Sequence, residues 1–447
     1  MEKIFIAIKK IIPKTVFKFF QPYYHKVMSY SANFFYGCPS DKLIVIGVTG
    51  TNGKSTTTHL IAKILEAQGI KTGETSTTLF KIANKEWLND KKMTMLGRFE
   101  LQKMLSQMFK KKCKYAVIET SSEGIKQFRH LGINYDILVF TNLTPEHIEA
   151  HRGFENYKKA KLKLFKHLEK SKRKIIDNQK IKKIIVANLD DKHCEDFLDF
   201  KVDQKIGYFL NPENKKFELV NKYLLAKNCE CKKQGLSFEL KDQNFNLKLL
   251  GKFNIYNSLA SIGVGLSQRL DINEIKNILE KIKKIPGRME IIDEAQDFKI
   301  IVDYAPEPES LKQLYKFVNS LETNKIIHIL GSCGGGRDIA RRPILGKIAG
   351  KNADYIIVTN EDPYNDDPKK IIDDVSQGAI EKGKILNKNL FKILDRREAI
   401  KKSFFLAKKG DLVLITGKGS EQAICVANGK KIPWDDRKVA REELTKL

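Results

Sequence analysis

The sequence has few cysteines and no long hydrophobic run, and its acidic residues are far outnumbered by basic ones. The seven cysteines are scattered over 447 residues, and the one close pair, in "CEC", lacks the second pair that would complete a metal site. This pattern is typical of an intracellular, reduced protein, so we expect a cytoplasmic location.

No stretch approaches the ~18 consecutive apolar residues that indicate a membrane-spanning helix. The first forty residues mix lysine with isoleucine, phenylalanine and tyrosine, and the lysines interrupt the apolar centre that a secretory signal needs. For residues 1–41 we therefore expect a short helical extension packed on the first domain. A helix that lies on a membrane surface, in weak contact with it, is the alternative.

The basic excess is large: 81 lysines and arginines against 54 acidic residues give a net charge of +27. The lysines occur along the whole chain in short runs such as "FKKKCK", and no zinc finger, recognition helix or aromatic-interleaved patch accompanies them. We expect a lysine-rich surface that favours anionic substrates and no nucleic-acid partner. We also expect a monomer.

Short apolar runs separated by helical stretches predict an α/β protein with mostly parallel sheets. The runs fall into two groups, "LIVIGV", "YAVIET", "YDILVFTN" and "KIIVAN", then "KIIHILGS", "DYIIVTN" and "DLVLITG". Between the groups, a helical region ends at Pro286 and Gly287, which predicts a domain boundary there. We expect a central P-loop ATPase domain over 42–286 and a Rossmann-like α/β domain over 287–447. Alternation within 210–250 predicts a small antiparallel edge sheet.

The stretch "VIGVTGTNGKST", residues 45–56, reads as a strand, a phosphate loop and the start of a helix. Its glycines let backbone N–H groups turn toward an anion, Lys54 reaches the terminal phosphates, and Ser55 supplies a ligand for Mg²⁺. The spacing departs from the common G-x-x-x-x-G-K-[ST] pattern, because Gly47 lies one residue too far back. The predicted ATP-binding residues of this loop are Gly50, Thr51, Asn52, Gly53, Lys54, Ser55 and Thr56.

Two further residues stand where strands end, which is where open parallel sheets bind ligands. Glu119 closes "YAVIET", and His147 follows the strand in "YDILVFTN". Alone, the glutamate would be a solvated cap and the histidine a satisfied polar group. With a phosphate loop in the same sheet, both become candidate Mg²⁺ partners.

A set of motifs in fixed order carries a resemblance to a known family. The motifs are "GVTGTNGKST", "ETSSEGIKQFR", "TNLTPEHIEAHRGFENYKKAKLKLF", "GKFNIYNSLA", "PGRME", "VDYAPEPESL", "GSCGGGRDIARRP", "EDPYNDDP", "GKGSEQ" and "WDDRKVARE". From residue 43 to the end, the chain resembles the Mur ligase family, in the branch that adds the third residue of the peptide stem. The resemblance implies an ATP- and Mg²⁺-dependent amide ligase of peptidoglycan synthesis. It implies that a UDP-muramyl dipeptide carboxylate is activated as an acyl phosphate and then joined to an amino acid.

The resemblance also implies residue roles. Lys161 matches the family's carbamylated lysine, which adds CO₂ and becomes an oxygen ligand for Mg²⁺, whereas by itself it would pass as one more surface lysine. The implied catalytic and metal residues are Lys54, Ser55, Glu119, His147 and Lys161. The implied residues around the rest of the nucleotide are Asn254 and Asn257 at the adenine, Asp303 at the ribose, and Arg288. The implied acceptor-binding residues are Ser121, Gln127 and Arg129. The implied amino-acid-binding residues are Arg337, Asp362, Tyr364, Gly417 and Glu421.

Several positions depart from the family pattern. Relatives that add meso-diaminopimelate carry D-N-P-R, whereas this chain reads E-D-P-Y at 361–364, so the arginine that grips the far carboxylate is missing. This favours L-lysine, or a shorter basic diamino acid, as the substrate. Only about forty residues precede the first strand, where the family has a domain that holds UDP, and the usual Thr-Thr-Pro reads "TML". Alternatives are therefore a lipid-linked or folylpolyglutamate-type acceptor, or a non-catalytic nucleotide-binding subunit.

Overall fold

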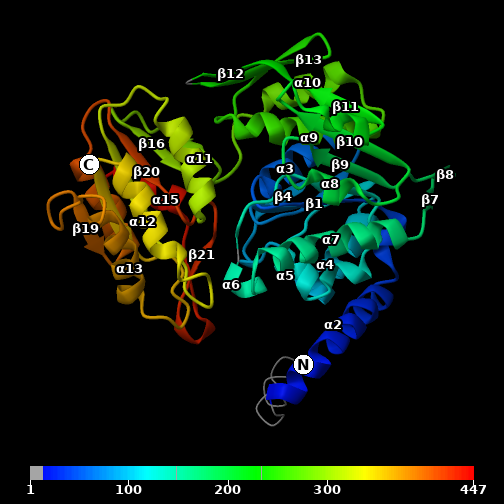
Figure 1. Cartoon of the computed structure of the whole chain (residues 1–447), viewed down its shortest axis with the longest axis horizontal. Coiled ribbons are helices and arrows are strands. Elements are labelled where there is room, and N and C mark those ends of the chain that lie inside the picture. Colours follow the sequence, from blue (N-terminus) through cyan, green and yellow to red (C-terminus); the bar gives the residue numbers. More distant parts are fainter. Residues whose placement is uncertain (1–13, 147, 233, 447) are drawn as a thin grey trace.

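The computed structural model describes residues 14–146, 148–232 and 234–446, and in these ranges it shows two α/β bodies side by side (Figure 1). The first body is built on a nine-stranded sheet and the second on a six-stranded sheet. The predicted α/β class with mostly parallel sheets is confirmed. The predicted boundaries at residues 41 and 286 stay predictions.

The nine-stranded sheet has the order β11-β10-β9-β6-β1-β5-β2-β3-β4. β1 lies between β5 and β6 and runs parallel to both, and all its residues are buried, which is why its sequence is a continuous apolar run. The edge formed by β2, β3 and β4 is antiparallel. The strands are β1 (Ile44–Thr49), β2 (Thr72–Thr75), β3 (Leu79–Ile82), β4 (Lys85–Leu88), β5 (Tyr115–Glu119), β6 (Ile137–Phe140), β9 (Ile184–Asn188), β10 (Gln204–Phe209) and β11 (Lys222–Leu225).

Helices cover both faces of this sheet. One buried cluster joins the sheet to α3, α9 and α10, and a second joins its other face to α4 and α7. The helices of the first body are α2 (Lys14–Phe35), α3 (Lys54–Leu65), α4 (Arg98–Lys110), α5 (Ser122–Lys126), α6 (Ile148–His151), α7 (Phe154–Lys170), α8 (Cys194–Leu198), α9 (Phe253–Ser267) and α10 (Ile272–Lys281). Its 3-10 turns are η1 (Pro39–Lys42), η2 (Ala67–Gly69), η3 (Arg129–Gly132) and η4 (Lys215–Leu219), and its short hairpin pairs β7 (Ile175–Ile176) with β8 (Gln179–Lys180).

The antiparallel sheet expected over 210–250 is confirmed only in its second half. There β12 (Lys227–Lys232), β13 (Gly235–Leu240) and β14 (Gln243–Leu247) form an antiparallel sheet. The first half was wrong, because Lys215–Leu219 is a 3-10 turn and β11 pairs in parallel with β10. Leu224 of β11 is buried in the core of the first body, so this strand extends the main sheet.

The second body has the strand order β15-β16-β20-β17-β18-β19, with only β15 antiparallel to its neighbour among these pairs. α11, α12 and α13 pack on one face, and α14 and α15 pack on the other. The strands are β15 (Glu290–Ile292), β16 (Lys299–Val302), β17 (Ile326–Leu330), β18 (Tyr355–Thr359), β19 (Leu390–Ile393) and β20 (Leu412–Ile415). The helices are α11 (Pro308–Val318), α12 (Arg341–Asn352), α13 (Pro368–Ile380), α14 (Arg396–Leu406) and α15 (Asp436–Leu444). A hairpin of β21 (Ala423–Cys425) and β22 (Lys431–Pro433) encloses the turn η5 (Ala427–Gly429).

The N-terminal helix α2 projects from the first body (Figure 1) and is fixed to it at its C-terminal half. Ser29 Oγ donates a hydrogen bond to the Phe128 carbonyl (2.8 Å), and Arg98 Nε donates to the His25 carbonyl (3.2 Å). Among the helices of the described residues, none combines the length and apolar character that crossing a bilayer requires.

Candidate nucleotide and ligase site

The phosphate loop connects β1 to α3 at the centre of the large sheet. α3 begins at Lys54, and its cap residue Gly53 has a left-handed backbone (φ 81°). A Cβ atom at Gly53 would overlap Asn257 Oδ1, so the close approach of α9 to the loop requires glycine here. Lys54 Nζ donates to the Thr51 carbonyl (2.6 Å), which holds the ammonium against the loop. The first turn of α3 offers N–H groups that have no acceptor within the helix, so the loop fits an anion.

Ser55 joins the phosphate loop to both β5 and the second body. Its hydroxyl donates to Glu119 Oε2 (2.9 Å), and Arg288 Nη2 donates to the same hydroxyl (3.2 Å). Glu119 is 1% exposed and also accepts a hydrogen bond from the Thr77 N–H (2.7 Å). The Arg288 guanidinium carbon lies 4.6 Å from the centre of the Tyr304 ring, a cation–π contact that fixes its position. A hydroxyl beside a carboxylate suits Mg²⁺, and Arg288 suits a phosphate.

Lys161 lies on α7, is 1% exposed and contacts the phosphate loop. Its Nζ donates to the Gly50 carbonyl (2.6 Å) and lies 4.5 Å from the centre of the Tyr157 ring. Burial, together with the nearby Lys54 ammonium, holds the pKa of Lys161 well below its ordinary value. This shift favours the neutral amine, the form that can add CO₂.

Asn254 and Asn257 belong to α9 and lie on its side that faces the phosphate loop. Asn257 Nδ2 donates to Asn254 Oδ1 (2.8 Å), and Asn257 Oδ1 accepts from the Thr57 hydroxyl (3.2 Å). Asp303 follows β16 and accepts a hydrogen bond from the Met289 N–H (2.7 Å). Burial raises the pKa of Asp303. These polar groups border the loop at the junction of the two bodies.

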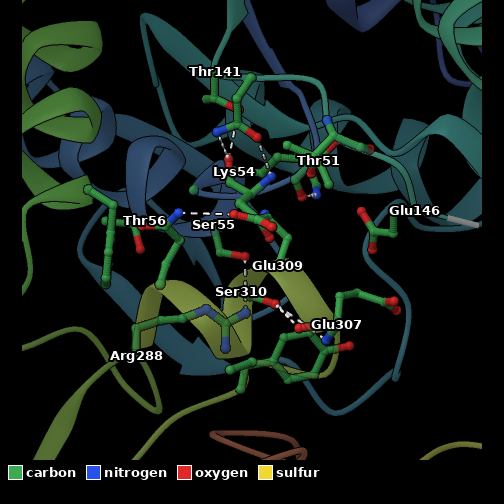
Figure 2. A pocket seen from close by; sticks show the side chains of 18 of the residues that line it. Thr51, Lys54, Ser55, Thr56, Thr141, Glu146, Arg288, Glu307, Glu309 and Ser310 are labelled. Atoms are coloured by element: carbon green, nitrogen blue, oxygen red, sulfur yellow. Dashed lines mark hydrogen bonds between the residues drawn. The ribbon is translucent and has the colours of Figure 1, made fainter. Parts of the chain in front are cut away.

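A cavity of about 610 Å³ runs between the two bodies, within the size range of ligand pockets. Figure 2 shows Lys54 and Ser55 on one side of it and Arg288, Glu307 and Ser310 on the other. The predicted residues that line it are Thr51, Asn52, Gly53, Lys54, Ser55, Thr56, Glu119, Ser121, Lys161, Asn254, Asn257, Arg288, Asp303 and Arg337. Gly50 is not among the lining residues, but its carbonyl accepts a hydrogen bond from Lys161, which is one of them. His147 lies outside the described residues.

The other predicted substrate residues lie beyond this lining. Gln127 and Arg129 pair with each other through Arg129 Nη2 and Gln127 Oε1 (2.7 Å). Asp362 and Glu421 belong to a buried charged cluster in the second body. Gly417 and Tyr364 flank that cluster: Gly417 is packed against the Glu361 side chain, and Tyr364 N–H donates to the Cys425 carbonyl (3.0 Å).

Several residues at or beside the site carry no motif or pattern from which their position could be predicted. Tyr157 lines the cavity, and its hydroxyl lies 3.1 Å from Thr51 Oγ1. Arg341 forms an ion pair with Glu307. Lys92 and Lys418 bind Asp362 from two sides (2.7 and 2.8 Å). Within the described residues, no three His, Cys, Asp or Glu side chains converge as a ready metal site. The Ser55 hydroxyl and the Glu119 carboxylate are oxygen groups of the kind that Mg²⁺ binds together with phosphate oxygens.

The fold and the cavity define a P-loop enzyme whose nucleotide site is completed by a second α/β body. Family models match as "Mur ligase middle domain" at residues 48–265 and "Mur ligase, glutamate ligase domain" at residues 287–419. A Bacillus cereus UDP-N-acetylmuramoyl-L-alanyl-D-glutamate–2,6-diaminopimelate ligase is 36% identical over 93% of this chain and 80% of the relative. A Roseiflexus UDP-N-acetylmuramyl-tripeptide synthetase is 35% identical over 92% of this chain and 81% of the relative.

Solved structures show the same likeness. The structure of a UDP-N-acetylmuramoyl-L-alanyl-D-glutamate–2,6-diaminopimelate ligase matches with a TM-score of 0.59 and 28% identity, over 94% of this chain and 83% of that one. Mycobacterium tuberculosis folylpolyglutamate synthase has a TM-score of 0.67 at 14% identity, over 88% and 92%, and shows the shared fold alone. The chain belongs to the Mur ligase family, as its motifs predicted, and its homologues are of the MurE type. It is therefore an ATP-dependent ligase.

Proposed function

We propose that this protein joins a diamino acid, L-lysine in preference to meso-diaminopimelate, to the UDP-MurNAc-L-Ala-D-Glu stem. The observation that carries the proposal is the charged cluster of the second body, in which Asp362 and Glu421 lie together and are bound by ammonium groups. Two carboxylates suit a substrate whose far end is an amine. The residue where diaminopimelate-adding relatives have arginine is Tyr364, which has no charge to pair with a far carboxylate.

The proposed reaction has two steps. Bound ATP supplies the γ-phosphate that turns the acceptor carboxylate into an acyl phosphate with release of ADP, and Mg²⁺ offsets the negative charge. The amino group then displaces phosphate and forms the amide. In these steps Lys54 and Arg288 supply positive charge, and Ser55 and Glu119 supply oxygen ligands for the metal. The junction between the two bodies limits the access of water to the activated carboxyl group.

Lys161 is proposed to act as a carbamate. Its neutral amine would add CO₂ and release one proton, which gives an anionic carbamate whose oxygen atoms would be available to the metal beside Glu119. Support comes from its burial and its lowered pKa, because an ordinary charged lysine would repel Mg²⁺. His147 is the proposed third metal partner. Asn254, Asn257 and Asp303 are proposed to hold the adenosine part of the nucleotide.

The acceptor and the amino acid are proposed to bind at opposite ends of the junction. Ser121, Gln127 and Arg129 lie on the α5 side of the first body, and we assign them to the muramyl dipeptide. Arg337 and Gly417, with the acidic cluster, are assigned to the amino acid. We further propose a reducing, cytoplasmic location, supported by the seven cysteines, which are all free in the structure.

The test is a reaction of the purified chain with ATP, Mg²⁺, UDP-muramyl dipeptide and a panel of amino acids. ADP and the mass of the product are measured. The proposal predicts a product with L-lysine that forms more slowly, or not at all, with meso-diaminopimelate. A clear preference for meso-diaminopimelate would contradict the lysine assignment, and product with a different carboxylate only would contradict the acceptor.

A lipid-linked acceptor is the second candidate, and helix α2 favours it. Val27, Tyr30 and Phe34 follow one another at helical spacing, and all three are exposed, with Phe34 83% exposed. The opposite face of α2, with Ser29 and Ala32, is buried against the first body. An exposed aromatic face on a protein with a net charge of +27 fits the surface of an anionic bilayer.

Sedimentation with lipid vesicles tests this second candidate. The chain should sediment with vesicles that contain phosphatidylglycerol and much less with phosphatidylcholine alone. The double variant Val27→Ser, Phe34→Ser should lose binding, whereas Phe405→Ser, which changes an exposed phenylalanine of the other body, should keep it. Equal binding by the two variants would remove the support for a membrane-bound acceptor.

A further inference from the structure

Lys92 crosses from the first body into the acidic cluster of the second. It lies in the loop between β4 and α4, and its side chain is only 4% exposed. Its Nζ lies 2.7 Å from Asp362 Oδ2 and also contacts Glu421 Oε2. A lysine is rarely buried unless its charge is paired, and here both partners lie 270 or more positions away in the chain.

The charges of the cluster are balanced only while two ammonium groups are present. Lys418 Nζ, which belongs to the second body, lies 2.8 Å from Asp362 Oδ1 and 3.0 Å from Glu421 Oε2. It also donates to the Ala423 carbonyl (2.6 Å) and has no exposed side-chain surface. Burial opposes ionisation of Asp362, but Lys418 and Lys92 outweigh it and hold its pKa below the ordinary value. Without Lys92, one of the two carboxylates would lose its ion-pair partner, so binding of another ammonium there would be favoured.

The cluster adjoins the wall of the large cavity. Cys333 lines that cavity, and its Sγ lies 4.0 Å from Asp362 Oδ2. Tyr304 and Arg337 also line it, and burial together with the Glu421 carboxylate raises the pKa of Tyr304. Lys92 Nζ therefore lies against the same oxygen atom, Asp362 Oδ2, that the cavity-lining Cys333 approaches.

The loop can release Lys92 without losing its own structure. Asn89 holds the backbone, donating to the Met93 carbonyl (3.0 Å) and accepting from the Lys91 N–H (2.8 Å). Only the flexible side chain of Lys92 has to leave, and an incoming ammonium would restore the same balance of charge. When another ammonium replaces that of Lys92, both carboxylates remain paired. When Lys92 leaves without a replacement, one of them loses its partner.

We infer that Lys92 is a built-in competitor of the amino-acid substrate: with no amino acid bound, it occupies the subsite for the substrate's distal ammonium. The inference rests on the proposed function for the identity of that substrate. The ligand of this subsite is then a primary amine on an unbranched chain, the same chemistry as the lysine side chain that occupies it. Binding of the amino acid then also releases one contact between the two bodies.

The test compares Lys92→Met with Lys91→Met. Methionine keeps the apolar chain of Lys92 and removes the ammonium. Lys91 is the matched control, because it lies in the same loop but its side chain is 44% exposed. The KM for L-lysine should fall about tenfold in Lys92→Met, as expected when a competing state of about 90% occupancy is removed. It should be unchanged in Lys91→Met. Lys92→Gln carries the same expectation should Lys92→Met fail to fold.

Calorimetric binding of L-lysine and norleucine, without ATP, separates this inference from the proposed function. Lys92→Met should bind L-lysine about tenfold more tightly than the unaltered chain, and norleucine, which lacks the distal amine, should gain nothing. Binding of L-lysine that is unchanged or weaker in Lys92→Met would overturn the inference, even where the ligase turns over. Tighter binding by a chain that forms no product would support the inference and contradict the proposed function.

Discussion

Replacing Gly53 with alanine should damage the phosphate loop far more than the same change at Gly69. Both glycines have left-handed backbones, with φ of 81° and 75°, and they lie before and after α3. An alanine in this conformation costs about 1–2 kcal/mol at either position. At Gly69 no heavy atom lies within 4 Å of the added Cβ, whereas at Gly53 the Cβ would overlap Asn257 Oδ1.

The extra cost at Gly53 follows from the bonds that Asn257 makes. When Asn257 moves aside, it loses its hydrogen bonds to Thr57 (3.2 Å) and Asn254 (2.8 Å). At about 1 kcal/mol each, these raise the loss of unfolding free energy to about 3–4 kcal/mol, against about 1–2 kcal/mol for Gly69→Ala. Urea unfolding measures both variants.

The same pair tests nucleotide binding. ADP at a hundred times its Kd should stabilise the unaltered chain and Gly69→Ala by about 2.7 kcal/mol, and Gly53→Ala by much less. In an Asn257→Gly background, Gly53→Ala should cost only the backbone term, because the overlap is gone. Equal losses in the two single variants, or equal stabilisation by ADP, would refute the claim that α9 closes on this loop.

Further outcomes follow from the same site and from the buried histidines. Lys161→Ala should lower turnover at least about 100-fold, and short carboxylic acids should restore part of it; full activity without them would exclude the carbamate. Arg288→Lys should lower kcat about tenfold with little change in unfolding free energy, because lysine lacks the planar contact with Tyr304; an unchanged kcat would contradict its role. Burial lowers the pKa of His130 and of His328 to about 3, so the unfolded chain takes up protons first as the pH falls below about 6.5. Each histidine should therefore lower the unfolding free energy by about 2 kcal/mol between pH 7.5 and pH 5. In His328→Gln this loss should be smaller by about 2 kcal/mol. An unfolding free energy that does not change with pH in urea unfolding would contradict this.

The sequence predicted the parts of the fold that depend on local order. The strand, loop and helix around Lys54 are contiguous, and their apolar spacing and glycines identify them without any partner. The prediction of an antiparallel pairing for β11 is wrong. The alternation of its side chains indicates a strand, but it does not indicate which strand is the partner, and here the partner is the parallel strand β10. The position of Lys161 could be assigned only through the family motif, since nothing in its neighbouring residues announces burial.

Lys92 shows the limit of sequence reasoning most clearly. Its loop sequence is that of an exposed, lysine-rich turn, and its partners Asp362 and Glu421 come from the other body. Contacts between two domains depend on how the domains meet, and no local pattern encodes this. The same holds for Arg288, which follows the predicted boundary yet donates to Ser55 of the phosphate loop.

The most direct test of the central claim is the stoichiometry of one reaction mixture. The purified chain receives ATP, Mg²⁺, UDP-muramyl dipeptide and L-lysine, and ADP and the mass of the product are followed together, with Lys54→Met as the control. The account predicts equal amounts of ADP and of a product heavier by one lysine residue, and neither from the control. Absence of ADP and of amide with every carboxylate and amine offered would contradict it.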